Sequence, residues 1–484
     1  MSDVAFRSAK ELAGLIRRKK IGALELLDAY LGRVEKYNPK LNAIIAMDVE
    51  GARRRARAAD RALAKKQVWG PLHGVPMTIK ESYDVVGMPS TWGVPALKDN
   101  LPKRNALAVD RLLAAGVVLF GKTNVPLNLA DWQSYNEIYG TTNNPWDVSR
   151  SPGGSSGGSA AALAAGLTGI EAGSDIGASI RNPAHFCGVF GHKPTYGIVP
   201  PRGQAPPGIV TPSDISVIGP MGRSAADLDL GLAAMAGGDE IDSTGWQLRL
   251  PAPRRKSLRE YKVAVMYSDP NSAVDQEVQD RLHAVVDFLA KKKVKVSERA
   301  RPAIDTAEAQ RVYVLLLRAA TSRRQTDEAF EQNLAIARGL APGDESYYAR
   351  MVRANTLFHR EWLTLNEARN QMRWRWAEFF REYDLLLCPP AASAAFPHDH
   401  VGERHERSIT VNGHRVPTTD QLFWAGYSGM VYLPSTVAPA GFTPDGLPVG
   451  VQIIGPQYGD RACIDFARHL EEGFQPFVPP AGYA

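Results

Sequence analysis

Residues 151–166, SPGGSSGGSAAALAAG, and residues 173–188, GSDIGASIRNPAHFCG, are the part of this 484-residue sequence that says most about the fold. The first stretch places Gly and Ser directly ahead of Ala160–Ala165, which favours a helix. A flexible linker would have a similar composition, but apolar segments follow both stretches, as in a packed domain. A Gly-rich turn that enters a helix presents backbone N–H groups to negative charge. We therefore expect a rigid turn here.

The second stretch contains a turn of small residues at 175–179. Small residues allow successive backbone N–H groups to point at one oxygen atom, which is the requirement for an oxyanion hole. A serine at the end of such a turn can be held beside a substrate carbonyl group. The residues alone do not select one serine, and the candidate nucleophiles are Ser155, Ser156, Ser159, Ser174 and Ser179.

Helical and extended segments alternate along the rest of the chain. Ser8 and Glu11 predict a capping box at a helix start, and an apolar repeat that begins at Leu24 predicts a helix ending at Asn38-Pro39. We expect further strands at residues 43–47, 75–80, 117–121, 263–267, 294–297, 384–388 and 449–454, and further helices at 108–115, 275–290, 305–382 and 462–472. This alternation predicts one α/β domain with helices on both faces of a sheet.

The composition is typical of a globular chain: hydrophobic residues make up 44% and charged residues 22%. No apolar run approaches the ~20 residues that span a bilayer, and the N-terminus has no signal-peptide pattern. Cys187, Cys388 and Cys463 lie far apart without a Cys-x-x-Cys pattern, which argues against a zinc site or a disulfide framework. Such cysteine usage favours a reducing compartment, so we expect a cytoplasmic protein without a membrane partner.

The net charge of +6 is a mild excess for a chain of this length. Two basic runs, Arg53-Arg54-Arg55 and Lys291-Lys292-Lys293, could indicate nucleic-acid binding. Neither run is interleaved with aromatic residues or belongs to a nucleic-acid-binding module. We interpret both as solvated helix faces and expect no nucleic-acid partner.

Several segments together resemble the amidase signature family of serine hydrolases. They are residues 74–91 (GVPMTIKESYDVVGMPST), 122–146 (KTNVPLNLADWQSYNEIYGTTNNPW), 151–166, 173–197, 219–228 (GPMGRSAADL) and 447–460 (LPVGVQIIGPQYGD). The resemblance implies a single domain over residues 1–484 with a central mixed β-sheet. It also implies an N-terminal helical region (1–66), a catalytic core (74–225) and a variable region that sets substrate specificity (237–420).

The resemblance assigns the family's catalytic lysine to Lys80, its bridging serine to Ser155 and its nucleophile to Ser179. It implies a cis peptide bond at Ser155 and an oxyanion hole made of backbone N–H groups, which would be those of Ile176, Gly177, Ala178 and Ser179. Many family members have a second glycine where this chain has Ala178. The chain therefore departs from the family at this turn. The difference matters for the backbone, because alanine does not readily adopt a strongly positive φ.

The implied mechanism depends on the protonation state of Lys80. This residue closes an apolar segment, so burial is expected to lower its pKa from ~10.4. A neutral Lys80 would accept a proton from Ser155, which accepts one from Ser179 as Ser179 attacks the carbonyl. Water would then hydrolyse the acyl-enzyme, without a metal or cofactor. A strand-end lysine is otherwise most often a surface residue, but the lead-in Gly74-Val75-Pro76 and the spacing to Ser155 favour catalysis.

Residues around these serines have two interpretations each. Asp175 and Arg181 either orient the oxyanion turn by hydrogen bonds or form an ordinary surface ion pair, and we favour the supporting role. Leu129 and Trp132 lie where the family lines its acyl-binding pocket, but they are explained equally well as core residues. The same two interpretations, pocket or core, apply to the other aromatic candidates, Tyr135, Phe358, Trp362 and Trp424.

Two motifs that favour other functions are set aside. Residues 116–123, GVVLFGKT, match the phosphate-binding P-loop, but Val117–Phe120 has the composition of a buried strand, whose N–H groups a sheet would use. Residues 153–157, GGSSG, match the nucleophile elbow of α/β-hydrolases, but a polar loop precedes them where an apolar strand is required.

The histidines offer no obvious partner for a nucleophilic serine. We interpret His185 and His192, which are close to the motif in sequence, as structural hydrogen-bonding residues. The spacing of His398, His400 and His405 does not match a helical pair of metal ligands, and we expect a polar loop near the site entrance.

We expect an amidohydrolase that acts on a hydrophobic, aryl or small aliphatic amide. The same acyl-transfer chemistry would serve a carbamate (urethane) or ester hydrolase. The alternative from another class is an amidotransferase subunit that releases ammonia from glutamine. An inactive binding protein is disfavoured, because the three catalytic residues are intact. The expected partner is a small-molecule amide or carbamate substrate, and a homodimer is compatible with the sequence.

Overall fold

An eight-stranded mixed sheet forms the centre of the molecule in the computed structural model, which describes residues 2–484. The first three strands of the sheet are mutually parallel, and all later neighbours are antiparallel. Across the sheet, the strands are β10 (Lys295–Ser297), β9 (Lys262–Val265), β11 (Leu385–Cys388), β15 (Pro448–Ile454), β14 (Ser435–Phe442), β7 (Phe190–Lys193), β8 (Val217–Gly222) and β6 (Glu171–Asp175). The prediction of an α/β domain with a mixed central sheet is confirmed.

A three-stranded sheet adjoins the β6 edge of the large sheet. Its middle strand is β3 (Val118–Thr123), which pairs antiparallel with β1 (Ile44–Met47) and parallel with β2 (Pro76–Lys80). Strand β2 contacts β6, so Lys80 at the end of β2 reaches Ser174 near the end of β6. Two short hairpins complete the strands: β4 (Tyr135–Asn136) with β5 (Gly140–Thr141), and β12 (Ser408–Val411) with β13 (His414–Pro417).

Helices cover both faces of the large sheet. Helices α6 (Gly157–Ala164) and α7 (Arg181–Cys187) pack together, and Val437 of β14 belongs to their apolar cluster. Side chains alternate between the two faces of a strand. The next residue, Ala438, accordingly belongs to the main core, which includes residues of α15 (Asp460–Gly473). Helices α8 (Ala225–Met235) and α9 (Gln276–Lys291) also contact the sheet.

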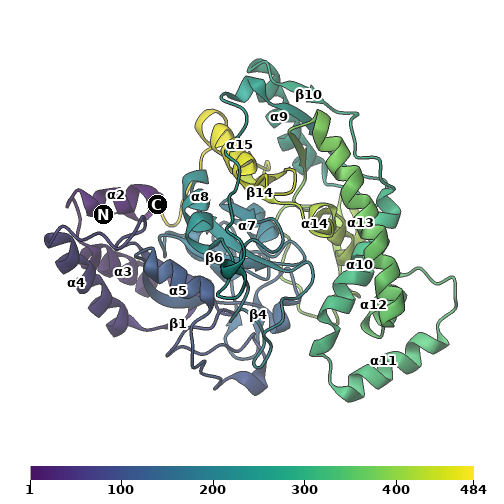
Figure 1. Ribbon diagram of the computed structural model, residues 1–484, viewed down its shortest axis with the longest axis horizontal. Helices are drawn as coiled ribbons and strands as arrows, with labels where there is room; N and C mark the ends of the chain where they lie inside the picture. Colours follow the sequence, from purple (N-terminus) through teal and green to yellow (C-terminus); the bar gives the residue numbers. More distant parts are fainter. Residues whose placement is uncertain (1) are drawn as a thin grey trace.

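The remaining helices form two groups at opposite ends of the molecule (Figure 1). The N-terminal group lies at left and the group from residues 306–429 at right, with the sheet between them. The first group comprises α1 (Ser2–Ala5), α2 (Ala9–Arg17), α3 (Ala23–Leu41), α4 (Val49–Ala64) and, nearer the centre, α5 (Leu107–Ala114). The second comprises α10 (Thr306–Thr321), α11 (Asp327–Gly339), α12 (Tyr347–Asn355), α13 (His359–Glu382) and, nearer the sheet, α14 (Leu422–Gly429).

Two predictions about the N-terminal helices have different outcomes. The capping box of Ser8 and Glu11 is confirmed at the start of α2. The prediction that the next helix ends at Asn38-Pro39 is wrong, because α3 continues to Leu41 with Pro39 in its last turn. Leu41 is fully buried, so tertiary packing outweighs the local preference of the residues around the proline. The helix ends at Asn42, which has a left-handed φ of 50°.

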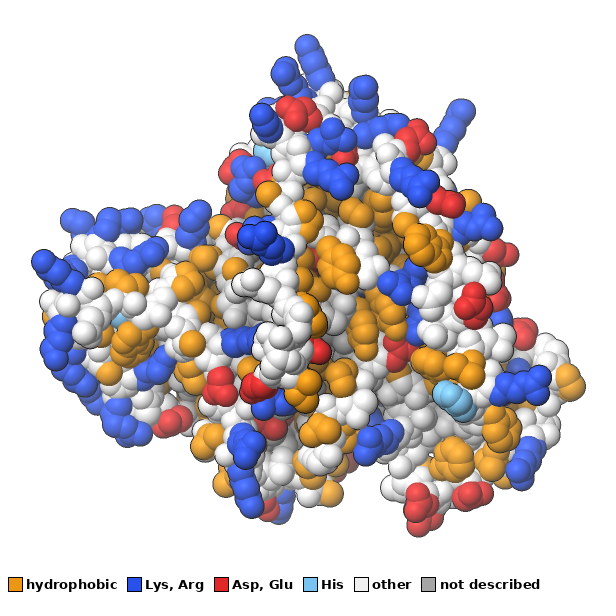
Figure 2. Space-filling view, viewed as in Figure 1, with side chains coloured by type: hydrophobic (Ala, Val, Ile, Leu, Met, Phe, Trp, Pro, Cys, Tyr) orange, Lys and Arg blue, Asp and Glu red, His pale blue; other side chains and the backbone are white. Residues whose placement is uncertain are grey.

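Basic side chains gather on the surface of the N-terminal helices, at left in Figure 2. Arg53 of α4 pairs with Asp28 at the surface. Arg55 departs from the predicted solvated face, because it is half-buried and donates hydrogen bonds to the carbonyl oxygens of Leu113 and Val117. This arginine therefore ties α4 to the start of β3.

The three cysteines, Cys187, Cys388 and Cys463, are free thiols and all are buried. Within residues 2–484, no helix combines the length and apolar character that a bilayer crossing requires. The same residues contain no group of His, Cys, Asp and Glu side chains arranged to hold a metal ion.

Candidate active site

Lys80 is fully buried at the end of β2. Every residue of this strand is buried. Its Nζ atom lies 2.7 Å from Ser155 Oγ, 2.9 Å from Ser156 Oγ and 2.9 Å from Ser174 Oγ. The amine is therefore surrounded by hydroxyl groups, with no carboxylate in hydrogen-bonding contact among the described residues.

This environment lowers the pKa of Lys80 well below its usual value of 10.5. Burial is the main cause, since removal from water disfavours the ammonium form. The positive charge of Arg324 acts in the same direction, and the carboxylate of Asp175 opposes both. A neutral Lys80 amine has a lone pair that can accept a proton from the adjacent Ser155 hydroxyl.

Two turns bring Ser155 and Ser179 to one cavity. Ser155 follows a cis peptide bond with Gly154 and lies just before α6. Ser179 lies between β6 and α7, and its carbonyl oxygen accepts a hydrogen bond from the Ser156 N–H at 3.1 Å. This bond holds the two serine-bearing turns against each other.

Asp175 shapes the turn that carries Ser179. Its carboxylate accepts hydrogen bonds from the backbone N–H groups of Ala178 (3.0 Å), Ile180 (3.1 Å) and Arg181 (3.3 Å). The Ala178 N–H was expected to belong to the oxyanion hole, and the structure corrects this because that N–H already donates to Asp175. In this conformation Ala178 has a φ of 67°, the left-handed region that its side chain disfavours.

The N–H groups of Ile176, Gly177 and Ser179 donate no hydrogen bond to any residue that the structure describes. These three are the other members of the expected oxyanion hole. They remain available to an oxygen atom of a bound substrate.

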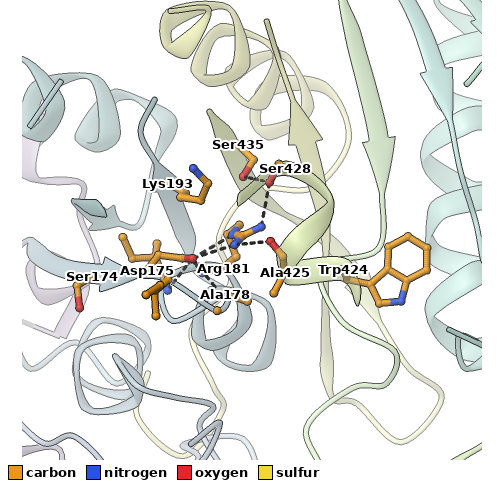
Figure 3. Close-up of polar contacts among 12 residues, drawn as sticks. Ser174, Asp175, Ala178, Arg181, Lys193, Trp424, Ala425, Ser428 and Ser435 are labelled. Atoms are coloured by element: carbon orange, nitrogen blue, oxygen red, sulfur yellow. Dashed lines mark hydrogen bonds and ion pairs between the residues drawn. The ribbon is translucent and has the colours of Figure 1, made fainter. Parts of the chain in front are cut away.

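Asp175 and Arg181 form a buried ion pair, so the interpretation as a surface pair is wrong. Figure 3 shows the guanidinium between Asp175 and the segment Ala425–Ser428 of α14. Arg181 also donates to Ser428 Oγ at 3.0 Å, to Gln452 Oε1 at 2.7 Å and to the Ala425 carbonyl oxygen at 3.0 Å. Burial alone would raise the pKa of Asp175, but the Arg181 guanidinium outweighs it and holds the pKa below its usual value.

The sequence resemblance implied a buried lysine in contact with a serine that follows a cis peptide bond. It also implied a second serine nearby, in a turn with free backbone N–H groups. Lys80, Ser155 and Ser179 are arranged in this way. A sequence model of the Amidase family matches residues 25–464. The chain belongs to the amidase family. This membership confirms the predicted family and the predicted enzyme class, a hydrolase of amide C–N bonds.

Relatives of this amidase cover nearly its whole length. It is 31% identical to a glutamyl-tRNA(Gln) amidotransferase subunit of Acidothermus cellulolyticus, over 98% of this chain and 96% of that protein. It is 33% identical to indoleacetamide hydrolase of Bradyrhizobium diazoefficiens, over 96% of this chain and 86% of that protein. The crystal structure of a bacterial aryl acylamidase of the amidase signature family has the same fold, with a TM-score of 0.81, 24% identity and coverage of 97% and 96%.

Side chains from two distant segments hold the amidase's Ser179 turn in place. Trp132 Nε1 donates to the Gly177 carbonyl oxygen at 2.8 Å, and the Tyr313 hydroxyl donates to the Ile176 carbonyl oxygen at 2.9 Å. In a trans peptide the C=O and the following N–H point in opposite directions, so the bond from Tyr313 also fixes the Gly177 N–H. Tyr313 comes from α10, and no local sequence pattern identified it.

Ser179 lies where two cavities meet. A cavity of about 220 Å³ is lined by Ser155, Ser179 and a proline-containing segment at 201–216. A second cavity of about 420 Å³ is lined by Ser179, Gly177 and Trp132. Leu129 lines both cavities, and Trp132, which lines the second, also belongs to the main core. Four other aromatic candidates line neither cavity: Tyr135, Phe358, Trp362 and Trp424.

The five candidate serines separate by their hydrogen bonds. Ser155, Ser156 and Ser174 contact Lys80, and Ser179 faces both cavities. The Ser159 hydroxyl instead bonds to Thr123 Oγ1 at 2.8 Å. Sequence reasoning could not foresee that Ser156 and Ser174 would share the lysine, because their partner is 76 and 94 residues away.

The competing motifs also have a clear place in this amidase. The P-loop-like residues form β3, whose N–H groups belong to the three-stranded sheet, and no strand directly precedes Ser155, as a nucleophile elbow would require.

Two of the histidines have structural contacts. Burial lowers the pKa of His185 to about 4, and its ring bonds to the backbone of Ser393 and Gly450. The ring of His400 stacks on Tyr135, with 3.7 Å between ring centroids.

Proposed function

We propose that the protein is a serine amidohydrolase in which Ser179 is the nucleophile and Ser155 and Lys80 carry its proton. The observation that supports this most directly is the 2.7 Å contact between Ser155 Oγ and the fully buried Lys80 Nζ, at a cavity that Ser179 shares. A lysine held neutral by burial replaces the histidine of the more common serine hydrolases as the base.

The proposed reaction has two acyl-transfer steps. Ser179 Oγ attacks the amide carbonyl carbon, its proton passes to Ser155 Oγ, and the Ser155 proton passes to Lys80 Nζ. The negative charge on the substrate oxygen is stabilised by the N–H groups of Ile176, Gly177 and Ser179. The relay then returns a proton to the leaving amine, and the C–N bond breaks to give an ester on Ser179. Water attacks this ester with the same relay as base, which releases the acid and regenerates the Ser179 hydroxyl.

The proposed substrates are hydrophobic, aryl or small aliphatic amides. Apolar side chains such as Leu129, Pro206 and Ile209 line the smaller cavity, and one relative is an indoleacetamide hydrolase. Carbamates and esters could undergo the same acyl transfer, so they belong in the same assay. We also propose that the variable region, residues 237–420, contributes to specificity, because Leu317 and Arg324 line the larger cavity.

A second candidate function is that of an amidotransferase subunit that releases ammonia from glutamine. The similarity to a glutamyl-tRNA(Gln) amidotransferase subunit over 98% of this chain favours it. Hydrolysis of simple amides by the isolated chain without ATP would support the independent hydrolase, whereas activity on glutamine that needs a partner protein would support the amidotransferase.

The test compares 4-nitroanilide, carbamate and ester substrates with the wild type and three variants, Ser179→Ala, Ser155→Ala and Lys80→Ala. We expect loss of turnover in all three, most severely in Ser179→Ala, and an acyl group on Ser179 in mass spectra of the wild type. Ser159→Ala is the matched control, because its hydroxyl bonds to Thr123 and not to Lys80. Near-wild-type turnover by Ser179→Ala would contradict the proposal.

A further inference from the structure

The larger cavity at Ser179 contains an unusual set of charges. Three arginines line it, Arg318, Arg324 and Arg404, and none of them forms an ion pair with a carboxylate in residues 2–484. Arg324 donates to the Asn128 carbonyl oxygen at 2.7 Å, and its guanidinium lies 5.1 Å from the centre of the Trp92 ring. These partners are neutral.

Arg318 and Arg404 share one neutral partner, the Tyr347 hydroxyl. Arg318 Nε donates to it at 3.0 Å and Arg404 Nη2 at 3.4 Å. The Arg404 guanidinium also lies 5.6 Å from the centre of the Trp132 ring. A single hydroxyl oxygen therefore serves two cations, and it cannot neutralise either.

Three buried arginines outside the cavity are paired with carboxylates. Arg181 pairs with Asp175, Arg369 with Asp214, and Arg407 with Asp131. A buried cation without a counter-charge is unfavourable, and burial lowers the pKa of Arg324 to about 10. Arg223 is buried as well, and its guanidinium donates only to neutral oxygens among the described residues, but it lines neither cavity at Ser179.

Two acidic residues line the cavity beside these three arginines. Asp131 is paired with Arg407 at 2.6 Å, and the charge of Arg404 also acts on its carboxylate. Glu403 is exposed at the rim. The interior of the cavity therefore has an excess of positive charge, together with the apolar side chains of Leu129, Leu317 and Leu422.

We propose that this cavity is a carboxylate-binding subsite, and that the preferred substrate is an amide with a carboxylate several atoms from the scissile carbonyl. The guanidinium fork matches the two oxygens of a carboxylate, and the leucines suit an alkyl or aryl spacer. Arg324 lines both cavities, so either the acyl part or the amine part of the substrate can carry the carboxylate. This proposal rests on the proposed function, because the cavity is a substrate subsite only if Ser179 attacks amides.

The test uses two pairs of amides that differ in one carboxylate. Glutaric acid mono-4-nitroanilide against hexanoic acid 4-nitroanilide places it on the acyl part. N-butyryl-4-aminobenzoate against N-butyryl-4-toluidine places it on the amine part. A charge-assisted pair with arginine is stronger than a neutral hydrogen bond, so we expect kcat/KM at least tenfold higher for the carboxylate member of one pair.

The variant Arg404→Met removes one cavity charge from a half-buried side chain, and Arg324→Met removes the deeper one. We expect Arg404→Met to lower kcat/KM at least tenfold for the carboxylate amide and less than threefold for its neutral partner. Arg338→Met is the matched control, because it removes the same charge from an exposed position on α11 outside the cavity. Equal or faster hydrolysis of both neutral amides by the wild type would overturn the subsite.

Failure of the proposed function has a different signature. In that case the wild type hydrolyses none of the four amides, or Ser179→Ala hydrolyses them as well as the wild type does. Calorimetric titration with glutarate then tests the cavity directly. Binding that is at least tenfold tighter to the wild type than to Arg404→Met supports the carboxylate site, and equal or absent binding overturns it.

Discussion

Asp175 and Arg181 meet at two points, with Arg181 Nη2 2.8 Å from Asp175 Oδ1 and Arg181 Nε 3.0 Å from Asp175 Oδ2. The pair joins the end of β6 to the start of α7, so it closes the turn that holds Ser179. Neither side chain is more than 1% exposed. The position of Ser179, the proposed nucleophile, therefore depends on the buried ion pair between Asp175 and Arg181.

Arg181→Met should leave the Asp175 carboxylate buried without its partner. We expect the free energy of unfolding to fall by about 3–5 kcal/mol, the usual cost of breaking a buried pair, with loss of activity. The double variant Asp175→Asn/Arg181→Met should lose less than the sum of the single variants, because no unpaired charge remains. Urea unfolding measures all three, and strictly additive losses would contradict the coupling.

The pH dependence of kcat/KM should report the protonation of Lys80. The reaction needs the neutral amine, so activity falls as the pH drops below the lowered pKa of Lys80. The Arg324 charge lowers that pKa, so Arg324→Met should raise it and move the acidic limb to higher pH. The pH profiles of both proteins are measured with a neutral amide as the substrate. An acidic limb that stays in place or moves to lower pH would refute the assigned base.

Lys80→Arg provides a complementary measurement. Arginine keeps the positive charge but does not lose its proton in proteins. We expect no recovery of activity at any pH at which the protein stays folded, in contrast to the wild type. If turnover by this variant rose with pH, the acidic limb of the pH profile would belong to a group other than Lys80.

Tyr313→Phe should lower kcat without a matching change in KM. The variant removes the donor to the Ile176 carbonyl oxygen, which orients the Gly177 N–H for the developing oxyanion. Loss of one such donor costs up to about 10²–10³ in kcat, and we expect about tenfold here because Tyr313 acts through the backbone. Tyr427→Phe is the control, since its buried hydroxyl has no hydrogen-bond partner among the described residues. A change confined to KM would assign Tyr313 to substrate binding.

The stability and activity of Ala178 variants should depend on how well each new residue fits the left-handed backbone conformation at this position. At a φ of 67°, a left-handed residue other than glycine costs about 1–2 kcal/mol, while glycine loses more entropy on folding. Ala178→Gly should thus stay within about 1 kcal/mol of the wild type, with activity retained. Ala178→Val should be clearly less stable and less active, because a β-branched residue fits this region poorly. Thermal unfolding of both variants distinguishes them, and a Val variant as stable as the Gly variant would argue against strain.

The sequence predicts one half of the large sheet, from β10 to β15, better than the other half, from β14 to β6. Apolar repeats and caps identify α2 and α9, and the unit β9-α9-β10 has the expected order. Four adjacent strands of the large sheet, β14, β7, β8 and β6, were not predicted. Strand β8 has the sequence VIGPMG, which is typical of a turn. A Cβ atom at Gly219 would lie 2.3 Å from the His192 carbonyl oxygen, so close packing of neighbouring strands requires that glycine.

For the site, the residues alone identify the region but not the arrangement. They indicated an oxyanion turn and left five serines open, and the family resemblance selected Ser155 and Ser179. The contact of Lys80 with Ser174 and the support from Tyr313 join segments 94 and 137 residues apart. The donation of the Ala178 N–H to Asp175 likewise depends on backbone angles that composition does not determine.

The buried cysteines make this enzyme suitable for attaching a single reporter group. Burial raises the pKa of the thiols of Cys187, Cys388 and Cys463, and thiolates are the form that alkylating reagents modify. Val210 lines the smaller cavity and is 81% exposed. In Val210→Cys, the new thiol would be accessible to maleimide dyes while the native three are shielded. A fluorophore placed there would signal, in real time, the entry and departure of compounds at the mouth of the enzyme.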